Sequence, residues 1–440
     1  MLITESKESY LKLIKETEIN DFILIPIFYN DKVHPILNNI SIIYISTKNE
    51  EFVVPINHPD CLNISNEEVN KLLSLIKLSK NKKFIIDKRN IQHNFKEELD
   101  ETWKDMELLD YIISNKLKNN FYEYTQAHKF IYRKFYNNSE NNLIIPLQKH
   151  IEYLHNIKDK ILKLLENKNI LESDTYNKMN SLLLNNLYRI ERNGIKTDNA
   201  DELIFYKYNP YTSTERPSCT YNGFNFVAMN KNDGTRKHFI SRFSDSGYLL
   251  LIDYNAYHFY LIADIIGEKF KEHPYKVLGK IFFNKDDLTE EEYKQSKQLL
   301  FEIIYGNIPE EFLSIPFFYK TQKFITELYR FYKENSYTET RLFKKKISNI
   351  KNITPNKLFN YYLQAYETEN NMIMLDKLYE FMENYESKTV LYIYDSVLID
   401  FNLNDGKDFI LKIKDIIEQD HKFPVSILYG KDYENLIKIV

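Results

Sequence analysis

The sequence predicts a multidomain protein of mixed α+β and α/β class. Its 440 residues leave room for two or three domains and a large core. Apolar residues make up 43% of the chain and charged residues 28%, a globular balance that argues against wholesale disorder. Short apolar runs alternate with segments of helical periodicity along the chain, which indicates both strands and helices.

The first 190 or so residues read as a strand meander followed by helices. Apolar runs bounded by polar turns predict short strands at residues 22–29, 42–45, 52–56 and 83–86. A helix is expected over 67–78, and a Leu-rich helical pattern with a polar break near 167–174 covers residues 142–190. The segment NGIKTD ends this pattern, and its Gly194 suits the left-handed position after a helix.

The second half of the chain begins with short strands up to about residue 252. A mostly helical region follows from residue 256 to residue 334. The end of the chain reads as strand, helix and strand, at residues 390–399, 407–419 and 425–429.

Charge and cysteine content narrow the function classes. The net charge of −4 gives no global basic signal, so any nucleic-acid surface must be local. Cys61 and Cys219 match no zinc spacing and favour a reduced, cytoplasmic setting. We see no signal peptide and no run of about 18 apolar residues, so we expect neither secretion nor a membrane span.

The stretch LLLIDYNAYHFYLIADIIG, residues 249–267, joins a predicted strand directly to a predicted helix. Asp253 stands at the junction, where a rigid strand end and nearby helix amides suit a metal ion and a polyanionic ligand. An acid at such a place is, by itself, more often a cap or turn residue.

A second acid, Asp395, stands in VLYIYDSVLIDF, which predicts a hairpin with the acid at its tip. Two carboxylates from distant segments are what two-metal phosphoryl transfer needs. The alternative is an ordinary polar turn.

A helical segment, EEYKQSKQLLFEIIYGN, places Lys297, Phe301 and Tyr305 at i, i+4 and i+8 on one face. The lysine suits a triphosphate and the two rings suit a sugar and a base. Aromatic stripes of this kind are also common in protein cores.

Taken in order, these segments resemble the motifs of the family A DNA polymerases, the group of bacterial polymerase I and many phage replicases. The matching segments are RIERNGIKTD (189–198), STERPSC (213–219), LLLIDYNAYHFY (249–260), YKQSKQLLFEIIYG (293–306), NYYLQA (360–365), IYDSV (393–397) and GKDY (430–433). The resemblance implies a right-hand polymerase palm and fingers after an N-terminal ribonuclease H-like domain of exonuclease type. The implied divisions are an exonuclease-like domain (1–140), a helical connector (141–198), palm (199–264), fingers (265–350) and palm again (351–440).

The resemblance also implies an activity and roles for single residues. The chain would be a template-directed DNA polymerase that adds dNTPs to a primer 3′ end. Asp253 and Asp395 would bind two Mg²⁺ ions, and the nucleotide would meet Lys297, Lys294, Phe301, Tyr305 and His258. Primer–template DNA would meet Arg216, Asn360 and Gln364.

Several departures from the family pattern stand out. His258 takes the place of a glutamate that crowds the sugar 2′ position, so we expect unusual discrimination between dNTPs and rNTPs. In IYDSV, Ser396 stands where the family motif His-Asp-Glu has its second acid. In YKQSKQLLFEIIYG, Glu302 stands where the family motif has a glycine.

Few residues separate Asp198 from Thr212, where the family has its thumb, so we expect a thumbless chain unless the Leu-rich helices of residues 142–187 substitute for the thumb. Without a thumb we expect weak, salt-sensitive DNA binding, low processivity and a partner protein that supplies the missing DNA contacts.

The N-terminal region lacks the metal-binding acids of the family's proofreading domain. Pro26, Ile27 and Phe28 stand at the first acidic motif, His128 stands at the last aspartate, and Glu98 lies near another acidic position. We therefore expect a scaffold without proofreading.

Two function classes remain open at this point. One is an Mg²⁺-dependent DNA polymerase, and the other is a specialised relative, such as a replisome scaffold, a primer maker or a template-independent nucleotidyl transferase. Retention of Asp253, Asp395, Lys297, Phe301 and Tyr305 favours the first, since unpaired buried acids repel each other. The reduced architecture favours a phage replicase acting in the host-cell cytoplasm.

Overall fold

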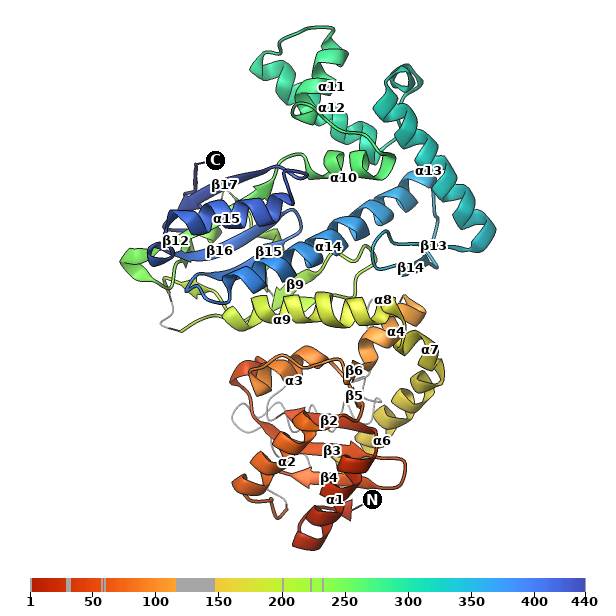
Figure 1. Ribbon diagram of the computed structural model, residues 1–440, viewed down its shortest axis with the longest axis vertical. Helices are drawn as coiled ribbons and strands as arrows, with labels where there is room; N and C mark the ends of the chain where they lie inside the picture. Colours follow the sequence, from red (N-terminus) through yellow and green to blue (C-terminus); the bar gives the residue numbers. More distant parts are fainter. Residues whose placement is uncertain are drawn as a thin grey trace. The chain divides into compact units, whose positions relative to one another are not determined.

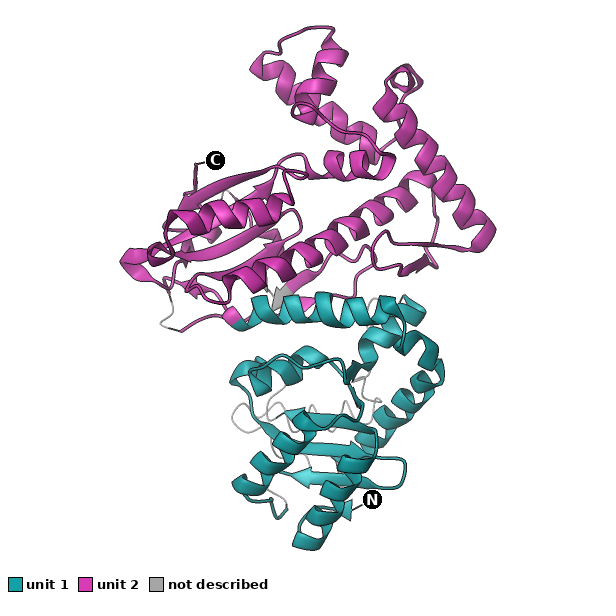
Figure 2. Cartoon of the chain, viewed as in Figure 1, with its two compact units in different colours: residues 1–192 teal, residues 193–440 magenta. Residues whose placement is uncertain are grey.

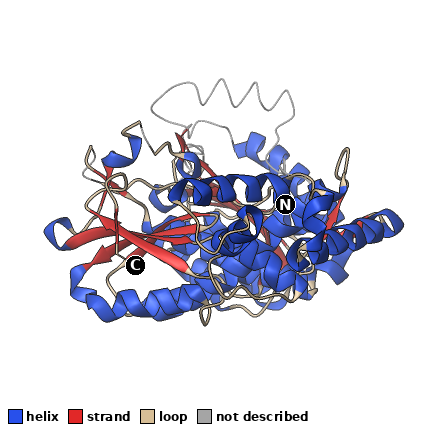
Figure 3. Cartoon of the chain, turned by 90° about the horizontal axis from the view of Figure 1, so that it is seen from above, coloured by secondary structure: helices blue, strands red, loops and turns tan. Residues whose placement is uncertain are grey.

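A computed structural model describes residues 2–28, 33–56, 58, 61–115, 147–199, 202–221, 224–231 and 233–439. The chain divides into two compact units, Met1–Arg192 and Asn193–Val440 (Figure 2). The chain contains both strands and helices (Figure 3). Each unit has its own β-sheet and its own helices (Figure 1), so the predicted mixed, multidomain class is confirmed. None of the helices in the described ranges is both long and apolar enough to cross a membrane.

The first unit is built on a six-stranded sheet. In order across the sheet the strands are β1 (Leu2–Ile3), β4 (Glu51–Pro55), β3 (Ile40–Ser46), β2 (Phe22–Phe28), β5 (Lys83–Ile85) and β6 (Trp103–Asp105). The predicted meander is confirmed, because β2, β3 and β4 pair antiparallel in sequence order. β5 and β6 extend the sheet in parallel beside β2, and β1 pairs parallel with β4.

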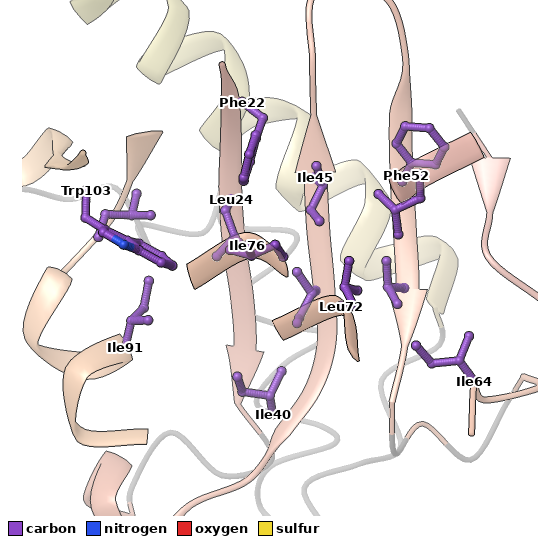
Figure 4. Packing of buried hydrophobic residues seen from close by; sticks show 14 of the residues in the cluster. Phe22, Leu24, Ile40, Ile45, Phe52, Ile64, Leu72, Ile76, Ile91 and Trp103 are labelled. Atoms are coloured by element: carbon purple, nitrogen blue, oxygen red, sulfur yellow. The ribbon is translucent and has the colours of Figure 1, made fainter. Parts of the chain in front are cut away.

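Helices of the first unit are α1 (Lys7–Ile19), α2 (Asn66–Leu78), α3 (Lys88–Phe95), α4 (Met106–Ser114), α6 (Leu147–Leu164), α7 (Lys168–Leu171), α8 (Asp174–Lys178) and α9 (Leu184–Asn193). A capping box between Ser65 and Glu68 begins α2, whose Leu72 and Ile76 lie one turn apart and are fully buried. They pack in one hydrophobic cluster with sheet residues such as Phe22 and Ile45 (Figure 4).

In the described residues, the side chains at the positions of the expected proofreading acids have structural roles. Pro26 and Ile27 are ladder residues of β2 and pair with β3. The Glu98 carboxylate accepts hydrogen bonds from two nitrogens of Arg189, at 2.5 and 2.8 Å. His128 and the expected boundary at residue 140 lie outside the described residues. Gly194 follows α9 with φ +58°, as the sequence predicted.

The second unit is built on a five-stranded antiparallel sheet. Its strands, in order, are β15 (Lys388–Ile393), β16 (Ser396–Asn402), β12 (Gly247–Tyr254), β17 (Val425–Gly430) and β18 (Ile437–Lys438). The predicted strand–helix–strand ending is confirmed, with β15 and β16 forming a hairpin before the helix. β7 (Lys196–Thr197) pairs with β11 (Phe239–Ile240) in a small sheet. Another small sheet contains β8 (Tyr208–Asn209), β9 (Ser218–Tyr221) and β10 (Phe224–Asn225), with β9 in the middle.

Helices of the second unit are α10 (Tyr257–Ile266), α11 (Pro274–Phe283), α12 (Glu290–Tyr305), α13 (Pro316–Asn335), α14 (Pro355–Met382) and α15 (Gly406–Glu418). A short hairpin of β13 (Tyr337–Glu339) and β14 (Lys346–Ser348) separates α13 from α14. The long helix α14 runs beside the sheet, and α10 follows directly from the end of β12 (Figure 1). This junction is where the candidate site lies.

Candidate active site

Asp253 lies on the central strand of the sheet, one residue before β12 ends. It pairs with Ser396 on one side and with Ser426 on the other. Its neighbour Tyr254 is buried and donates its hydroxyl to the carbonyl of Ile417 in α15. Because successive strand residues face opposite sides, the Asp253 carboxylate points to the face away from α15.

Asp395 lies in the two-residue turn between β15 and β16, directly before the Ser396 that pairs with Asp253. The Tyr254 amide donates to the carbonyl of Asp395 at 3.0 Å, which ties the two acid-bearing segments together. The preceding residue, Tyr394, has φ +51°, a left-handed conformation that costs a non-glycine residue about 1–2 kcal/mol. The expected hairpin with an acid at its tip is therefore confirmed.

A buried amide and an arginine hold this strained turn. Asn371 of α14 is fully buried and donates its Nδ2 to the Tyr394 carbonyl at 2.7 Å. The guanidinium of Arg216 lies 5.1 Å from the centre of the Tyr394 ring. Strain fixed by its surroundings is typical of functional sites, because it pre-organises a side chain.

Both acids titrate above the ordinary range. Burial and then the neighbouring charge of Asp395 raise the pKa of Asp253 to about 6, although Lys231 and Lys297 act in the opposite direction. Burial and then the charge of Glu367 raise the pKa of Asp395. Two buried carboxylates whose pKa values are raised form a place where a bound cation is favoured.

The two acids open into a cavity of ≈ 450 Å³ in the second unit. The start of α10, the inner face of α12 and the turn before β16 line it. Seven residues singled out from the sequence meet there: Asp253, Asp395, Lys297, Phe301, Tyr305, His258 and Arg216.

Helix α12 presents a cation and two rings to this cavity. A capping box of Thr289 and Glu292 begins the helix. The rings of Phe301 and Tyr305 lie 5.9 Å apart and only 8° from parallel. Lys297 is exposed one turn earlier, with its Nζ 5.9 Å from the centre of the Tyr275 ring. The helix therefore offers a positive charge and then a flat aromatic surface.

Glu367 of α14 forms the buried floor of the cavity, and sequence reasoning missed it. Its Oε2 accepts from Nε of Arg216 at 2.5 Å, and its Oε1 lies 3.4 Å from Nε2 of His258. Burial raises its pKa, but the charges of His258 and Arg216 outweigh that effect and lower it overall. Glu367 therefore stays ionised between two basic side chains.

His258 links this carboxylate to α12. Its Nε2 lies 3.0 Å from a terminal nitrogen of Arg216, and its Nδ1 lies 2.5 Å from the Tyr305 hydroxyl. The imidazole is only 7% exposed. Glu367, Arg216, His258 and Tyr305 therefore form one connected polar chain along the cavity wall.

Asn371 is the second residue that sequence reasoning missed. Besides holding Tyr394, its amide donates to the Tyr392 hydroxyl at 3.2 Å and accepts from the Tyr257 hydroxyl at 2.7 Å. A signal was present in the spacing: Asn360, Gln364, Glu367 and Asn371 follow one another at i, i+4, i+7 and i+11. Polar residues at this spacing share one helix face, and in a buried helix they need partners.

Three of the residues singled out from the sequence do not line the cavity. Lys294 is exposed and pairs with Glu290 one turn earlier, with 3.0 Å between Nζ and Oε1. Asn360 and Gln364 lie half-buried toward the start of α14, on the face that carries Glu367. Their expected roles stay predictions.

A second buried charge cluster supports the loop that carries Arg216. Glu215 pairs with Lys345 at 3.4 Å, and both side chains are at most 5% exposed. The Glu369 carboxylate accepts from the amides of Leu342 and Phe343, at 2.7 and 3.0 Å. Lys345 therefore has a structural role in this segment.

The donor set at the two acids suits Mg²⁺. Within the described residues, no group of three His, Cys, Asp or Glu side chains lies close enough to hold a metal without other ligands. Mg²⁺ is commonly held by one or two carboxylates together with substrate phosphates and water. Asp253 and Asp395 supply carboxylates of raised pKa beside a cavity, so the residues fit this ion.

Comparisons with known proteins agree with the geometry at the level of fold. No family model and no curated protein matches the sequence. Among the solved structures, the chain is similar to the POL domain of Pol1 from M. smegmatis, in complex with DNA primer-template and dNTP. The TM-score is 0.72, over 98% of this chain and 99% of that chain, at 11% sequence identity.

The chain has a DNA polymerase fold. The comparison covers both units, because it spans nearly the whole chain.

Proposed function

We propose that this protein is a template-directed DNA polymerase of the family A type, which adds dNTPs to a primer 3′ end. The observation that carries the proposal is the meeting of Asp253 and Asp395 with Lys297, Phe301 and Tyr305 in one cavity. The polymerase fold adds independent support. In this proposal residues 199–264 and 351–440 are the palm and residues 265–350 are the fingers.

The chain's own residues would act by position and charge. Two Mg²⁺ ions at Asp253 and Asp395 would supply charge neutralisation for the attacking and leaving oxygens. Lys297 would neutralise the triphosphate, and Phe301 and Tyr305 would pack against the sugar and base. Phosphoryl transfer needs positioning and electrostatic stabilisation more than covalent chemistry from the protein.

Contacts with DNA are proposed for Arg216 at the cavity wall and for two residues of α14 outside the cavity. Arg216 is already neutralised by Glu367, so we propose that it contributes a hydrogen-bond donor to primer or template rather than a free charge. Asn360 and Gln364 would lie near the template, and Lys294 would reach the triphosphate after leaving Glu290. Phosphate contacts fix register, while base-edge contacts read sequence.

The first unit is proposed to be a scaffold without proofreading. Apolar ladder residues occupy its first acidic motif, and Glu98 is held by Arg189. The short span from Asp198 to Thr212 leaves little sequence for a thumb, so in this proposal the isolated protein would bind DNA weakly, and a partner protein would raise its processivity. Catalysis in the host-cell cytoplasm during phage replication fits this reduced architecture.

Primer extension by the full chain tests the proposal. A labelled primer–template is incubated with Mg²⁺ and single dNTPs, alongside a D253A control and a primer without template. We expect addition of the complementary dNTP by the wild-type protein only, and only on the template. Addition without template would favour a template-independent transferase, and no addition by the wild type would favour a scaffold.

A further inference from the structure

The sugar of a bound nucleotide can be placed from the order of groups along α12. Lys297 precedes Tyr305 by eight residues, which corresponds to about 12 Å along a helix. A triphosphate that meets Lys297 and the two acids leaves its sugar on the far side of the acids. The sugar then lies toward Tyr305, His258 and the end of the cavity that Glu367 closes.

The hydrogen-bond partners of His258 fix which ring nitrogen carries the proton. A guanidinium can only donate, so His258 Nε2, 3.0 Å from Arg216, acts as the acceptor in the neutral ring. The single proton of the neutral ring is then on Nδ1. The other neutral tautomer, with Nδ1 bare, would set two donors against each other at 3.0 Å.

Nδ1 therefore donates to the oxygen of Tyr305, 2.5 Å away. Burial raises the pKa of Tyr305 to about 12, so its hydroxyl keeps its own proton near neutral pH. Within the described part of the chain, Tyr305 makes no other hydrogen bond, and its side chain is partly open to the cavity. The hydroxyl proton is left for a ligand.

We propose that the Tyr305 hydroxyl donates a hydrogen bond to the 2′-hydroxyl of the incoming nucleotide, so that the cavity takes ribonucleoside as well as deoxyribonucleoside triphosphates. The inference rests on the proposed nucleotide-binding function. A carboxylate at position 258 would have the opposite effect, because it would accept the Tyr305 proton and leave no donor for the sugar. Glu367 is the positioning residue, since it holds Arg216 against His258.

The gain from one neutral hydrogen bond is modest. Such a bond contributes about 0.5–1.5 kcal/mol, or roughly a twofold to tenfold change in binding. Tyr305 is 36% exposed, so water can satisfy its hydroxyl when a deoxyribose is bound. We therefore expect ribose to be accepted, with no strong rejection of deoxyribose.

The test measures binding separately from chemistry. The full chain is loaded with a primer–template whose primer ends in a dideoxynucleotide, and the Kd values of ATP and dATP opposite a template thymine are compared with Mg²⁺ present. The variants are Y305F, which removes only the hydroxyl, and H258E, which reverses the hydrogen bond. Y319F, an exposed tyrosine of α13, is the matched control.

In the wild type we expect the Kd values of ATP and dATP to lie within about tenfold of each other. Y305F and H258E should each weaken ATP relative to dATP by at least about twofold, and Y319F should leave the ratio unchanged. A smaller change in Y305F, or a wild-type Kd for ATP more than about tenfold above that for dATP, overturns the proposal. If primer extension fails but the binding ratios behave as expected, the proposed polymerase activity is wrong and the sugar contact stands.

Discussion

Replacing Asn371 with alanine should loosen the turn that carries Asp395. Asn371 is fully buried and makes hydrogen bonds to the Tyr394 carbonyl and the Tyr392 and Tyr257 hydroxyls. Each bond contributes about 1 kcal/mol, and a partner left buried and unpaired costs about 1–3 kcal/mol. Because Tyr257 also accepts from Asn370, we expect a total loss near 3 kcal/mol, or about 100-fold in an opening equilibrium.

Hydrogen exchange of peptides from β15 and β16 measures this loss directly, because it reports local opening. The matched control is N370A, which removes one hydrogen bond, to the Tyr257 hydroxyl, and none to the turn. We expect about 100-fold faster exchange in N371A and at most about fivefold in N370A, with slower nucleotide addition in N371A. Equal exchange in the two variants would refute the view that Asn371 holds the turn.

Three further predictions concern other parts of the chain. Burial, followed by the charge of Glu215, raises the pKa of Glu369 from 4.5 to about 8, so the folded state keeps a proton that the unfolded chain loses. The free energy of unfolding should therefore fall as the pH rises between these two values. In urea titrations, E369Q should flatten this dependence on pH. K297A should raise the KM for dNTPs about 10-fold to 100-fold through loss of a charge-assisted contact, whereas K333A on α13 should not, and an unchanged KM in K297A would remove Lys297 from the triphosphate site. A primer with a 3′ mismatch should stay intact with the full chain; degradation that E98Q abolishes would show an active nuclease in the first unit.

Local patterns predicted the parts of the site that depend on neighbouring residues. The strand that ends near Asp253, the hairpin tip at Asp395 and the spacing of Lys297 and Tyr305 are all short-range features. The structure keeps each of them, because a strand or helix period fixes which side chains share a face.

Long-range packing determines the parts of the candidate site that the sequence did not predict. Glu367 lies more than a hundred residues after His258, and nothing in its own helix pattern names that histidine as its neighbour. Lys294 shares a helix face with Lys297 but lies nearer the start of α12, beyond the edge of the cavity, where Glu290 meets it. The contact between Glu367 and His258 and the position of Lys294 outside the cavity both depend on how the helices pack against one another.

Single-turnover addition of one complementary dNTP to a primer–template is the most direct test of the central claim, that Asp253 and Asp395 together form the reaction centre. The rate is measured with Mg²⁺ for the wild type, D253N and D395N. Because both carboxyl pKa values are raised in the fold, each asparagine should leave the protein at least as stable at pH 7. We predict that each substitution lowers the rate at least about 100-fold in a folded protein. A smaller loss in either folded variant would contradict the assignment of the pair.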